Sequence, residues 1–275
     1  MHTTASDGRL APAALVDRVR EAGLRTIAVT DHDTTQAIDE VSRLAAAYGI
    51  RVVPGIEVTS VDEGRDVHLL AYFVDHRDAA LERFLATQRE RRLERVREVG
   101  NRLAGLAVPV DVEALIARAR AKPGTAIGRP WIARALVRAG HARSVADAFD
   151  RWLGQGQPAY VPRLGPSPFE VLQVVHEAGG IVSFAHPGVT KRDGLLGPLS
   201  EAGLDAIEIH YSDHLPEVRE RYRARAIALG LATSGGSDFH GVGETRGVLG
   251  LVCLPPDEFH ALEARVVERA TRAQR

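Results

Sequence analysis

Several features are scarce in this sequence, and each shortage excludes a class of protein. No run of about 18 apolar residues is present, so a membrane-spanning helix is excluded. The only cysteine, Cys253, cannot close a disulfide within the chain, and we therefore expect a reducing compartment, the cytoplasm. The first residues also lack the basic and then apolar pattern of a secretory signal. Cys253 lies in an apolar run, residues 248–254, and we expect it to pack in the core.

The charged residues are unevenly divided along the chain, and only Lys122 and Lys191 are lysines. Residues 76–165 contain 17 Lys and Arg against 9 Asp and Glu, whereas the rest of the chain contains 18 against 27. The acidic part is rich in histidine, which indicates a cation site, and the basic part indicates an anionic ligand. Within the basic part, residues 89–98 are typical of a solvent-exposed helix whose Arg and Glu side chains pair at i,i+3.

The remaining composition is that of a globular protein, with 45% hydrophobic and 26% charged residues. Short apolar segments alternate with helical patterns over most of the chain. The predicted strands are residues 26–30, 51–56, 67–74, 180–185, 206–209 and 231–233, and the helices between them include residues 12–22, 37–48, 168–178 and 217–229. This alternation predicts an α/β fold with a parallel sheet, either open or closed into a barrel.

The alternation stops in the middle of the chain. Helical patterns follow one another there, at residues 79–103, 112–119, 130–139 and 145–153. We interpret this region as a helical insertion in the α/β domain. The predicted division of the chain is therefore residues 1–75 and 166–275 for the α/β domain and residues 76–165 for the insertion.

Residue types that bind metals follow the predicted strands. Active sites of parallel α/β folds lie at the carboxyl ends of the strands, and five strand ends lead into His, Asp or Glu, namely His32, Glu57, His186, His210, and the pair Asp238 and His240. Near the start of the chain, His2 and Asp7 flank a predicted turn. His68 is an exception, because it lies near the beginning of its apolar segment.

A single polar residue that follows a strand is most often a helix cap or a turn residue. Asp31, Asp33 and Asp205 can be explained in this way. Helix capping does not favour histidine, so it does not account for five such ends together. A mixture of imidazoles and carboxylates suits Zn²⁺, Mn²⁺ or Fe²⁺. The candidates are too many for one tetrahedral ion, and we expect two or three ions that share a bridging carboxylate.

Six short motifs in this order resemble those of the polymerase and histidinol phosphatase (PHP) superfamily of metal-dependent phosphoesterases. They are HTTASDG at 2–8, TDHDT at 30–34, PGIE at 54–57, VHLLAY at 67–72, FAHPG at 184–188 and GSDFH at 236–240. Two further segments, residues 128–130 and 158–162, are similar to the bacterial branch of 5′-3′ exoribonucleases and nucleoside 3′,5′-bisphosphate phosphatases. The resemblance covers nearly the whole chain.

The resemblance implies a distorted (βα)7 PHP barrel with up to three divalent ions at one end. The first ion would be held by His2, Glu57 and Asp238, the second by Glu57, His68 and His186, and the third by Asp7, His32 and His240. Catalysis would use a metal-bound water near Glu57, which attacks phosphorus without a protein nucleophile. His210 and His214 are not expected to bind the ions.

The chain departs from the family pattern at two places. The family opens with Asp-Leu-His-x-His, and Met1 stands at the x position, so we expect the first strand and one histidine ligand to be missing or truncated here. The hypothesis we favour is a protein that starts upstream of Met1, since an absent strand would leave ladder groups unpaired. Trp131 stands where this branch often has histidine.

The expected substrate is a phosphorylated small molecule, a nucleotide or an RNA end, with no membrane and no obligatory protein partner. Arginine forms bidentate contacts with phosphate, and Arg129 is the first candidate for substrate binding, ahead of Arg163 and Arg192.

Three alternatives remain open from the sequence. One is a histidinol-phosphatase-like phosphomonoesterase, and another is a catalytically impaired PHP module. The third is carbon–nitrogen hydrolysis by an amidohydrolase, which usually carries a carboxylated lysine. Neither Lys122 nor Lys191 directly follows a predicted strand, which disfavours this third alternative.

Overall fold

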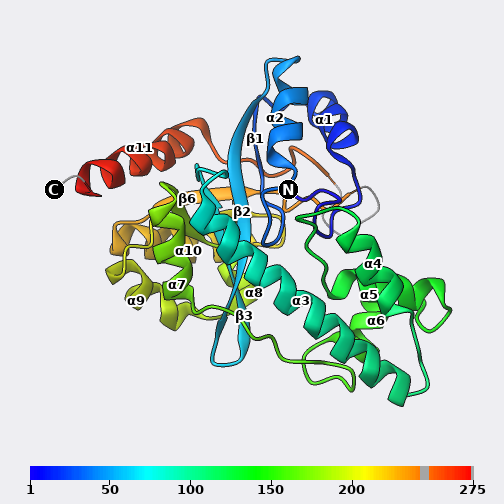
Figure 1. The fold of residues 1–275 in the computed structure, drawn as a ribbon. Coiled ribbons are helices and arrows are strands. Elements are labelled where there is room, and N and C mark those ends of the chain that lie inside the picture. The colour runs from blue at the N-terminus through cyan, green and yellow to red at the C-terminus, as the bar shows by residue number, and fades with distance from the viewer. Residues whose placement is uncertain (242–247, 274–275) are drawn as a thin grey trace.

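The computed structural model describes residues 1–241 and 248–273 of the protein, and these residues fold around one curled six-stranded sheet (Figure 1). The strands are β1 (Thr26–Val29), β2 (Arg51–Asp62), β3 (Arg65–Tyr72), β4 (Ile181–Phe184), β5 (Ala206–Tyr211) and β6 (Ala232–Gly236), and they neighbour one another in this order. All six predicted strands are therefore confirmed. The sheet leaves β1 and β6 as its two edges.

The prediction of an all-parallel sheet was wrong at β3. This strand runs antiparallel to both of its neighbours, whereas β1 pairs parallel with β2, and β4, β5 and β6 pair parallel with one another. Only Glu63 and Gly64 connect β2 to β3, and both have a positive φ, of 46° and 74°. A two-residue turn of this kind joins antiparallel strands, because parallel strands need a longer crossover.

The predicted helices of the α/β domain are confirmed. They are α1 (Pro12–Glu21), α2 (Ile38–Ala46), α7 (Pro168–Glu177) and α10 (Pro216–Leu229), and shorter helices lie at α8 (Pro187–Thr190) and α9 (Leu196–Glu201). Buried Ile56 and Leu69 of the sheet pack in one apolar cluster with Val171 of α7 and Tyr222 of α10. The helix α11 (Pro256–Ala273), which the sequence reading did not identify, packs beside β6.

The middle of the chain is helical, as predicted. It contains α3 (Ala79–Gly105), α4 (Val112–Arg120), α5 (Arg129–Arg138) and α6 (Val145–Ala148), and α6 continues into a π-helical turn at Phe149–Leu153. These helices share an apolar cluster of their own, which includes Leu103, Ile116, Ile132 and Leu136. Figure 1 shows α3 crossing the sheet, with α4, α5 and α6 gathered at one end of the molecule. The domain boundaries after residues 75 and 165 stay a prediction.

Two arginines of α3 are buried, so the prediction of a solvent-exposed helix at residues 89–98 was wrong for this face. Arg92 and Arg95 are 5% and 8% exposed. The Arg92 Nε donates to Asp33 Oδ2 at 2.6 Å, and its Nη2 donates to Thr59 Oγ1 at 3.0 Å. Asp33 is fully buried beyond the end of β1 and also accepts the Thr59 N–H at 3.0 Å. This buried ion pair joins the insertion to the sheet.

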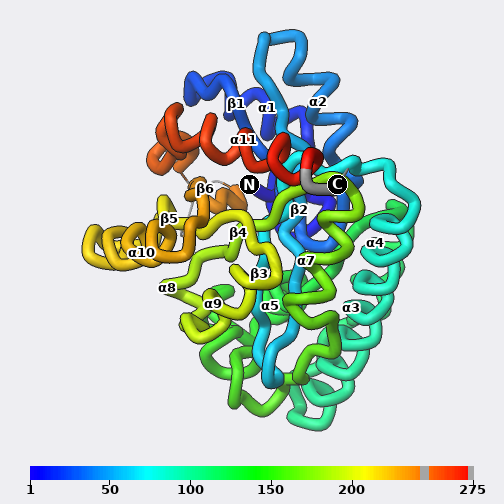
Figure 2. Tube along the Cα trace, turned by 90° about the vertical axis from the view of Figure 1, so that its left-hand side faces the viewer, coloured from blue at the N-terminus to red at the C-terminus, as the bar shows by residue number. Residues whose placement is uncertain are grey.

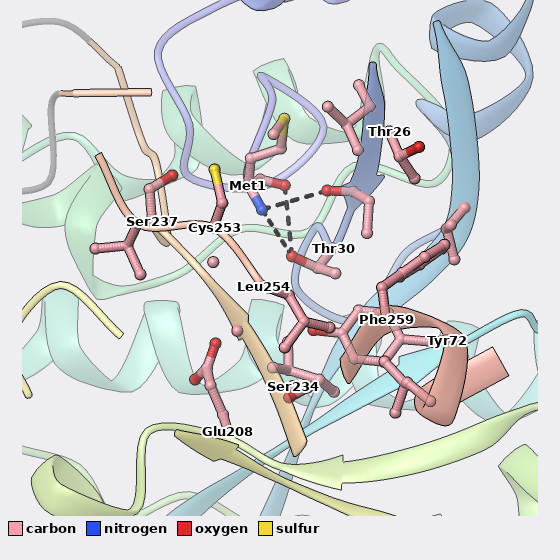
Figure 3. Close-up of a pocket in the computed structure, with 18 of the residues that line it drawn as sticks. Met1, Thr26, Thr30, Tyr72, Glu208, Ser234, Ser237, Cys253, Leu254 and Phe259 are labelled. Carbon is pink, nitrogen blue, oxygen red and sulfur yellow. Dashed lines mark hydrogen bonds between the residues drawn. The ribbon is translucent and has the colours of Figure 1, made fainter. Parts of the chain in front are cut away.

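A cavity of about 510 Å³ separates the two edge strands. It is lined mainly by apolar residues, among them Leu24, Val53, Phe259 and Leu262. Figure 3 shows Met1 at this cavity, beside Thr30 and opposite Ser234 and Glu208, and Figure 2 shows the N-terminus close to the sheet. The Thr30 N–H donates to Met1 O at 2.9 Å, and the Met1 amino group lies 3.5 Å from Ala28 O.

Cys253 corrects another prediction, since it is exposed and lines this cavity rather than the core. Its apolar neighbours Val248 and Leu251 are 59% and 73% exposed. A short apolar run outside any strand or helix therefore does not indicate burial here. In residues 1–241 and 248–273, no helix combines the length and the apolar character needed to cross a membrane.

The buried Arg92–Asp33 pair gives a prediction for stability. The substitution Arg92→Met leaves the Asp33 carboxylate buried without its closest cation, and we expect the free energy of unfolding to fall by about 3–5 kcal/mol. Urea denaturation measures this change. In the control Glu21→Gln, which breaks the exposed Arg18–Glu21 pair, we expect less than about 1 kcal/mol. Equal effects of the two substitutions would show that the buried pair does not stabilise the fold.

Candidate metal centre

The eight side chains predicted to bind metal all come to one end of the sheet. His2 and Asp7 lie on the turn that opens the chain, His32 follows β1, and Glu57 and His68 are in β2 and β3. His186 follows β4, whereas Asp238 and His240 follow β6. Seven of the eight line a cavity of about 400 Å³, and the eighth, His2, lies behind them with only 1% of its surface exposed.

The carboxylate of Glu57 is the centre of the cluster. Its Oε1 lies 2.5 Å from His68 Nδ1 and 3.3 Å from His186 Nε2, and its Oε2 lies 3.1 Å from His2 Nε2. The Glu57 side chain is 4% exposed. One buried carboxylate is therefore shared by imidazoles from three separate parts of the chain.

Two further carboxylates extend the cluster. Asp238 Oδ1 lies 3.0 Å from His2 Nε2, and Asp7 lies 3.3 Å from His240 Nε2 and 3.7 Å from His32 Nε2. The ring of His2 stacks on that of His240, with the ring centres 4.1 Å apart.

The potential ligand atoms form three sets, and the atoms within each set all lie within 4.8 Å of one another. The sets are His2, Glu57 and Asp238; His32, Glu57 and His68; and His2, Asp7, His32 and His240. The first set has the composition implied for the first ion, and the last contains the implied third set together with His2. The second set contains Glu57 and His68 as implied for the second ion, but its third member is His32 and not His186. His186 still contacts Glu57, at 3.3 Å, although it does not belong to this set.

The position of His68 has a simple explanation in the strand direction. Because β3 runs antiparallel to β2, the beginning of β3 lies beside the end of β2, and His68 is paired with Thr59. The rule that ligands follow strand ends applies to parallel strands only. Glu57 also lies inside β2, which continues to Asp62, and not after the strand as predicted.

The electrostatics of the cluster fit divalent cations. Burial alone would raise the pKa of Glu57, but His32 and His68 hold it well below its usual value. Burial lowers the pKa of His32 to about 3, and its buried Nδ1 has no hydrogen-bond partner. Burial also lowers the pKa of His2, but hydrogen bonds to Asp238 and Glu57 outweigh it and raise the value to about 10. The ionised carboxylates thus attract positive charge to the site.

Two buried acids that the sequence reading did not assign to the site hold it in shape. Asp31 accepts hydrogen bonds from Thr3 N at 2.7 Å, Thr3 Oγ1 at 2.6 Å and Ser6 Oγ at 2.6 Å, and so orders the turn that carries His2 and Asp7. Glu208 accepts the His186 N–H at 2.7 Å. Asp31 was interpreted as a possible cap, and no local sequence signal distinguishes a cap from this longer-range role.

The insertion also binds the turn that carries the ligands. Trp131 Nε1 donates to Ser6 O at 2.7 Å, and Arg134 donates from both Nη atoms to Asp7 O at 3.2 Å. Arg134 lines the cavity of the metal cluster, although the sequence reading had not selected it. Trp131, noted as a departure from the family pattern, therefore has a defined contact.

The arginines selected from the sequence lie outside the lining of this cavity. Arg129 Nη2 pairs with Asp66 Oδ2 at 3.2 Å, and the Nε of Arg163, a side chain that is 11% exposed, lies 3.4 Å from Asp66 Oδ1. Arg192 pairs with Asp62 and Glu63 at the tip of the β2–β3 hairpin. His210 and His214 are outside the three ligand sets, and their rings contact Glu258 and Ile209 O, respectively.

Comparison with known proteins agrees with this geometry. A family model described as PHP domain matches residues 1–101. The chain is 37% identical over 248 residues to the 5′-3′ exoribonuclease Rnm of Escherichia coli, which covers 87% of this chain and 83% of that protein. It is also 34% identical over 281 residues to the 3′,5′-nucleoside bisphosphate phosphatase of Chromobacterium violaceum, with 98% and 97% covered.

A solved structure shares the fold over nearly the whole chain. A protein from Bifidobacterium adolescentis, described as a metal-dependent phosphoesterase, superposes with a TM-score of 0.87 and 35% identity over 96% of this chain and 94% of that one. The motifs, the cluster around Glu57 and these similarities lead to one assignment. The chain belongs to the PHP domain family.

Proposed function

We propose that this protein is a metal-dependent phosphoesterase that hydrolyses P–O bonds of nucleotides or of short RNA from the 5′ end. The observation that carries the proposal is the convergence of eight imidazole and carboxylate side chains, Glu57 among them, at one end of the sheet, where seven of them line one cavity. The relatives that cover most of the chain are named as an exoribonuclease and a nucleoside bisphosphate phosphatase. Both activities break a P–O bond of a nucleotide, so one site suits both.

The three ligand sets, two of which contain Glu57, would hold two or three divalent ions, of Mn²⁺, Zn²⁺ or Fe²⁺. When bound, such ions lower the pKa of water and neutralise phosphoryl oxygens. The chain itself orients the ligands: Tyr211 donates from its hydroxyl to Asp238 Oδ2 at 3.2 Å. On the insertion side, Val145 and Phe149 give the cavity an apolar wall that limits water around the substrate.

The alternatives from the sequence are less well supported by the geometry. Neither Lys122 nor Lys191 lines the cavity in the described part of the chain, so the carboxylated lysine of typical amidohydrolases has no counterpart there. A catalytically impaired module would not need seven other potential ligands grouped with the Glu57 carboxylate. A histidinol-phosphatase-like activity is distinguished from nucleotide hydrolysis by comparing the two kinds of substrate.

Hydrolysis assays test the proposed function. We expect turnover of a nucleoside 3′,5′-bisphosphate and of a 5′-phosphorylated RNA oligomer, loss of both activities after chelation, and recovery with Mn²⁺ or Zn²⁺. The substitution Glu57→Gln is expected to lower kcat at least about 100-fold and to reduce the bound ions measured by elemental analysis, whereas Glu82→Gln, at an exposed position, serves as the control. Hydrolysis of histidinol phosphate alone would contradict the nucleotide assignment.

A second proposal concerns the arginines around Asp66. Arg95, Arg129 and Arg163 surround this one carboxylate, and together with Arg92 and Asp33 they leave an excess of positive charge. Burial lowers the pKa of Arg163 to about 9, and its Nε and the Arg95 Nη2 are buried without a hydrogen bond. We propose that this arginine cluster binds the second phosphate of the substrate, with Arg129 at its edge.

The substitution Arg129→Met tests this second site. We expect KM for a nucleoside 3′,5′-bisphosphate to rise about tenfold, since one charge-assisted phosphate contact is lost, with little change for a nucleoside 3′-monophosphate. Arg192→Met, which changes an arginine paired with Asp62 and Glu63, is the control. An equal rise in KM for both substrates would contradict a second-phosphate role for Arg129.

We also propose that one more strand fills the cavity between β1 and β6 and completes the (βα)7 barrel. The bonds of Met1 to Ala28 and Thr30 have the pattern of a parallel ladder that leads into this cavity. A chain extended before Met1 by a segment ending in Asp-Leu-His is expected to melt several degrees higher, since about 1 kcal/mol shifts Tm by about 2–4 °C. A Gly-Ser extension of the same length is the control, and equal melting temperatures would contradict the proposal.

A further inference from the structure

Arg134 holds a distinctive position at the metal cluster. Among the described residues that line the 400 Å³ cavity, it is the single Lys or Arg side chain, and the other ionisable groups there are histidines, carboxylates and Tyr211. The arginine cluster around Asp66 lies outside the lining of this cavity. A negatively charged substrate that enters the cavity therefore meets one permanent cation of the chain itself.

The guanidinium of Arg134 is held in a fixed place. Both Nη atoms donate to the carbonyl oxygen of Asp7 at 3.2 Å, and the carboxylate of the same residue lies 3.3 Å from His240 Nε2. Trp131, one turn earlier on α5, donates to Ser6 O at 2.7 Å, and Ala126 N donates to Ala5 O at 2.8 Å. Two contacts from α5 and one from the segment before it thus hold the insertion against the turn that carries two of the candidate metal ligands.

We propose that Arg134 binds a non-bridging oxygen of the phosphoryl group that is hydrolysed. This inference rests on the proposed phosphoesterase function and adds a substrate contact to it. A guanidinium stays charged at all working pH values and matches phosphoryl oxygens in geometry. The distribution of negative charge on those oxygens changes as the P–O bond breaks. A cation held beside them stabilises the charge of the transition state.

Arg134 and Arg129 would bind different phosphate groups of the substrate. Arg134 contacts the reacting phosphate, so its loss weakens every phosphate ester substrate and also the inorganic phosphate product. Arg129 belongs to the arginine cluster around Asp66 and acts on the second phosphate, so its loss weakens only substrates that carry two phosphates. The two variants therefore differ in their substrate dependence.

The test compares Arg134→Gln and Arg134→Lys with Arg138→Gln, an exposed arginine one turn further along the same helix. For Arg134→Gln we expect kcat/KM to fall about 10²–10³-fold for mono- and bisphosphate substrates alike. Arg134→Lys should recover part of this loss, because it restores the charge without the fork. Arg138→Gln should match the unaltered protein.

A binding measurement makes the test independent of turnover. Calorimetric titration of the metal-loaded protein with inorganic phosphate should show at least about tenfold weaker binding for Arg134→Gln, with an unchanged ion content by elemental analysis. Unchanged phosphate binding would overturn the proposal. Loss of bound ions together with activity would also overturn it, and would show that Arg134 acts only by holding Asp7. If the unaltered protein binds phosphate but hydrolyses no ester, and Arg134→Gln weakens that binding, the proposed function fails while the contact of Arg134 with phosphate is supported.

Discussion

The structure depends on one constraint, which is the burial of several ionised carboxylates in one place. Glu57 is almost completely buried, and Asp7 and Asp238 lie close to it through shared histidines. Burying such charges is unfavourable unless cations compensate them. Imidazoles supply part of this compensation, and divalent ions of the kind the family binds would supply the rest. The surrounding hydrogen bonds of Asp31 and Glu208 make sense as the framework that keeps these groups together.

Much of this arrangement could be predicted from the sequence, because it follows from local patterns. Apolar segments of the right length indicated all six strands, and polar residues in and after the strands indicated the candidate metal ligands. The direction of β3 was the part that failed, although the two-residue connection at Glu63 and Gly64 carried the necessary signal. Once that turn is recognised, the antiparallel register places His68 near Glu57 without reference to any family.

Other features could not be predicted, because they depend on contacts between distant parts of the chain. Arg92 belongs to a stretch of alternating charges that looks solvent-exposed, yet it is buried against Asp33, 59 residues away. Asp31 has the local pattern of a cap and instead accepts three hydrogen bonds from the first turn of the chain. The prediction that Cys253 packs in the core was wrong in the opposite sense, because this residue is exposed although its neighbours in the sequence are apolar. Local patterns identify elements well, whereas the partner of a polar side chain is decided by the tertiary fold.

The helical insertion also helps to position the residues of the candidate metal site. Its helix α5 binds the carbonyl oxygens of Ser6 and Asp7, which belong to the same turn as two predicted ligands. Its helix α3 supplies Arg92 to Asp33, the residue that follows His32. Under the proposals made above, arginines of the same insertion, Arg134 and the cluster around Asp66, would bind the phosphate groups of the substrate. Because the contacts of α5 position the turn with two candidate metal ligands and Arg134 together, we expect ion binding and substrate recognition to depend on each other.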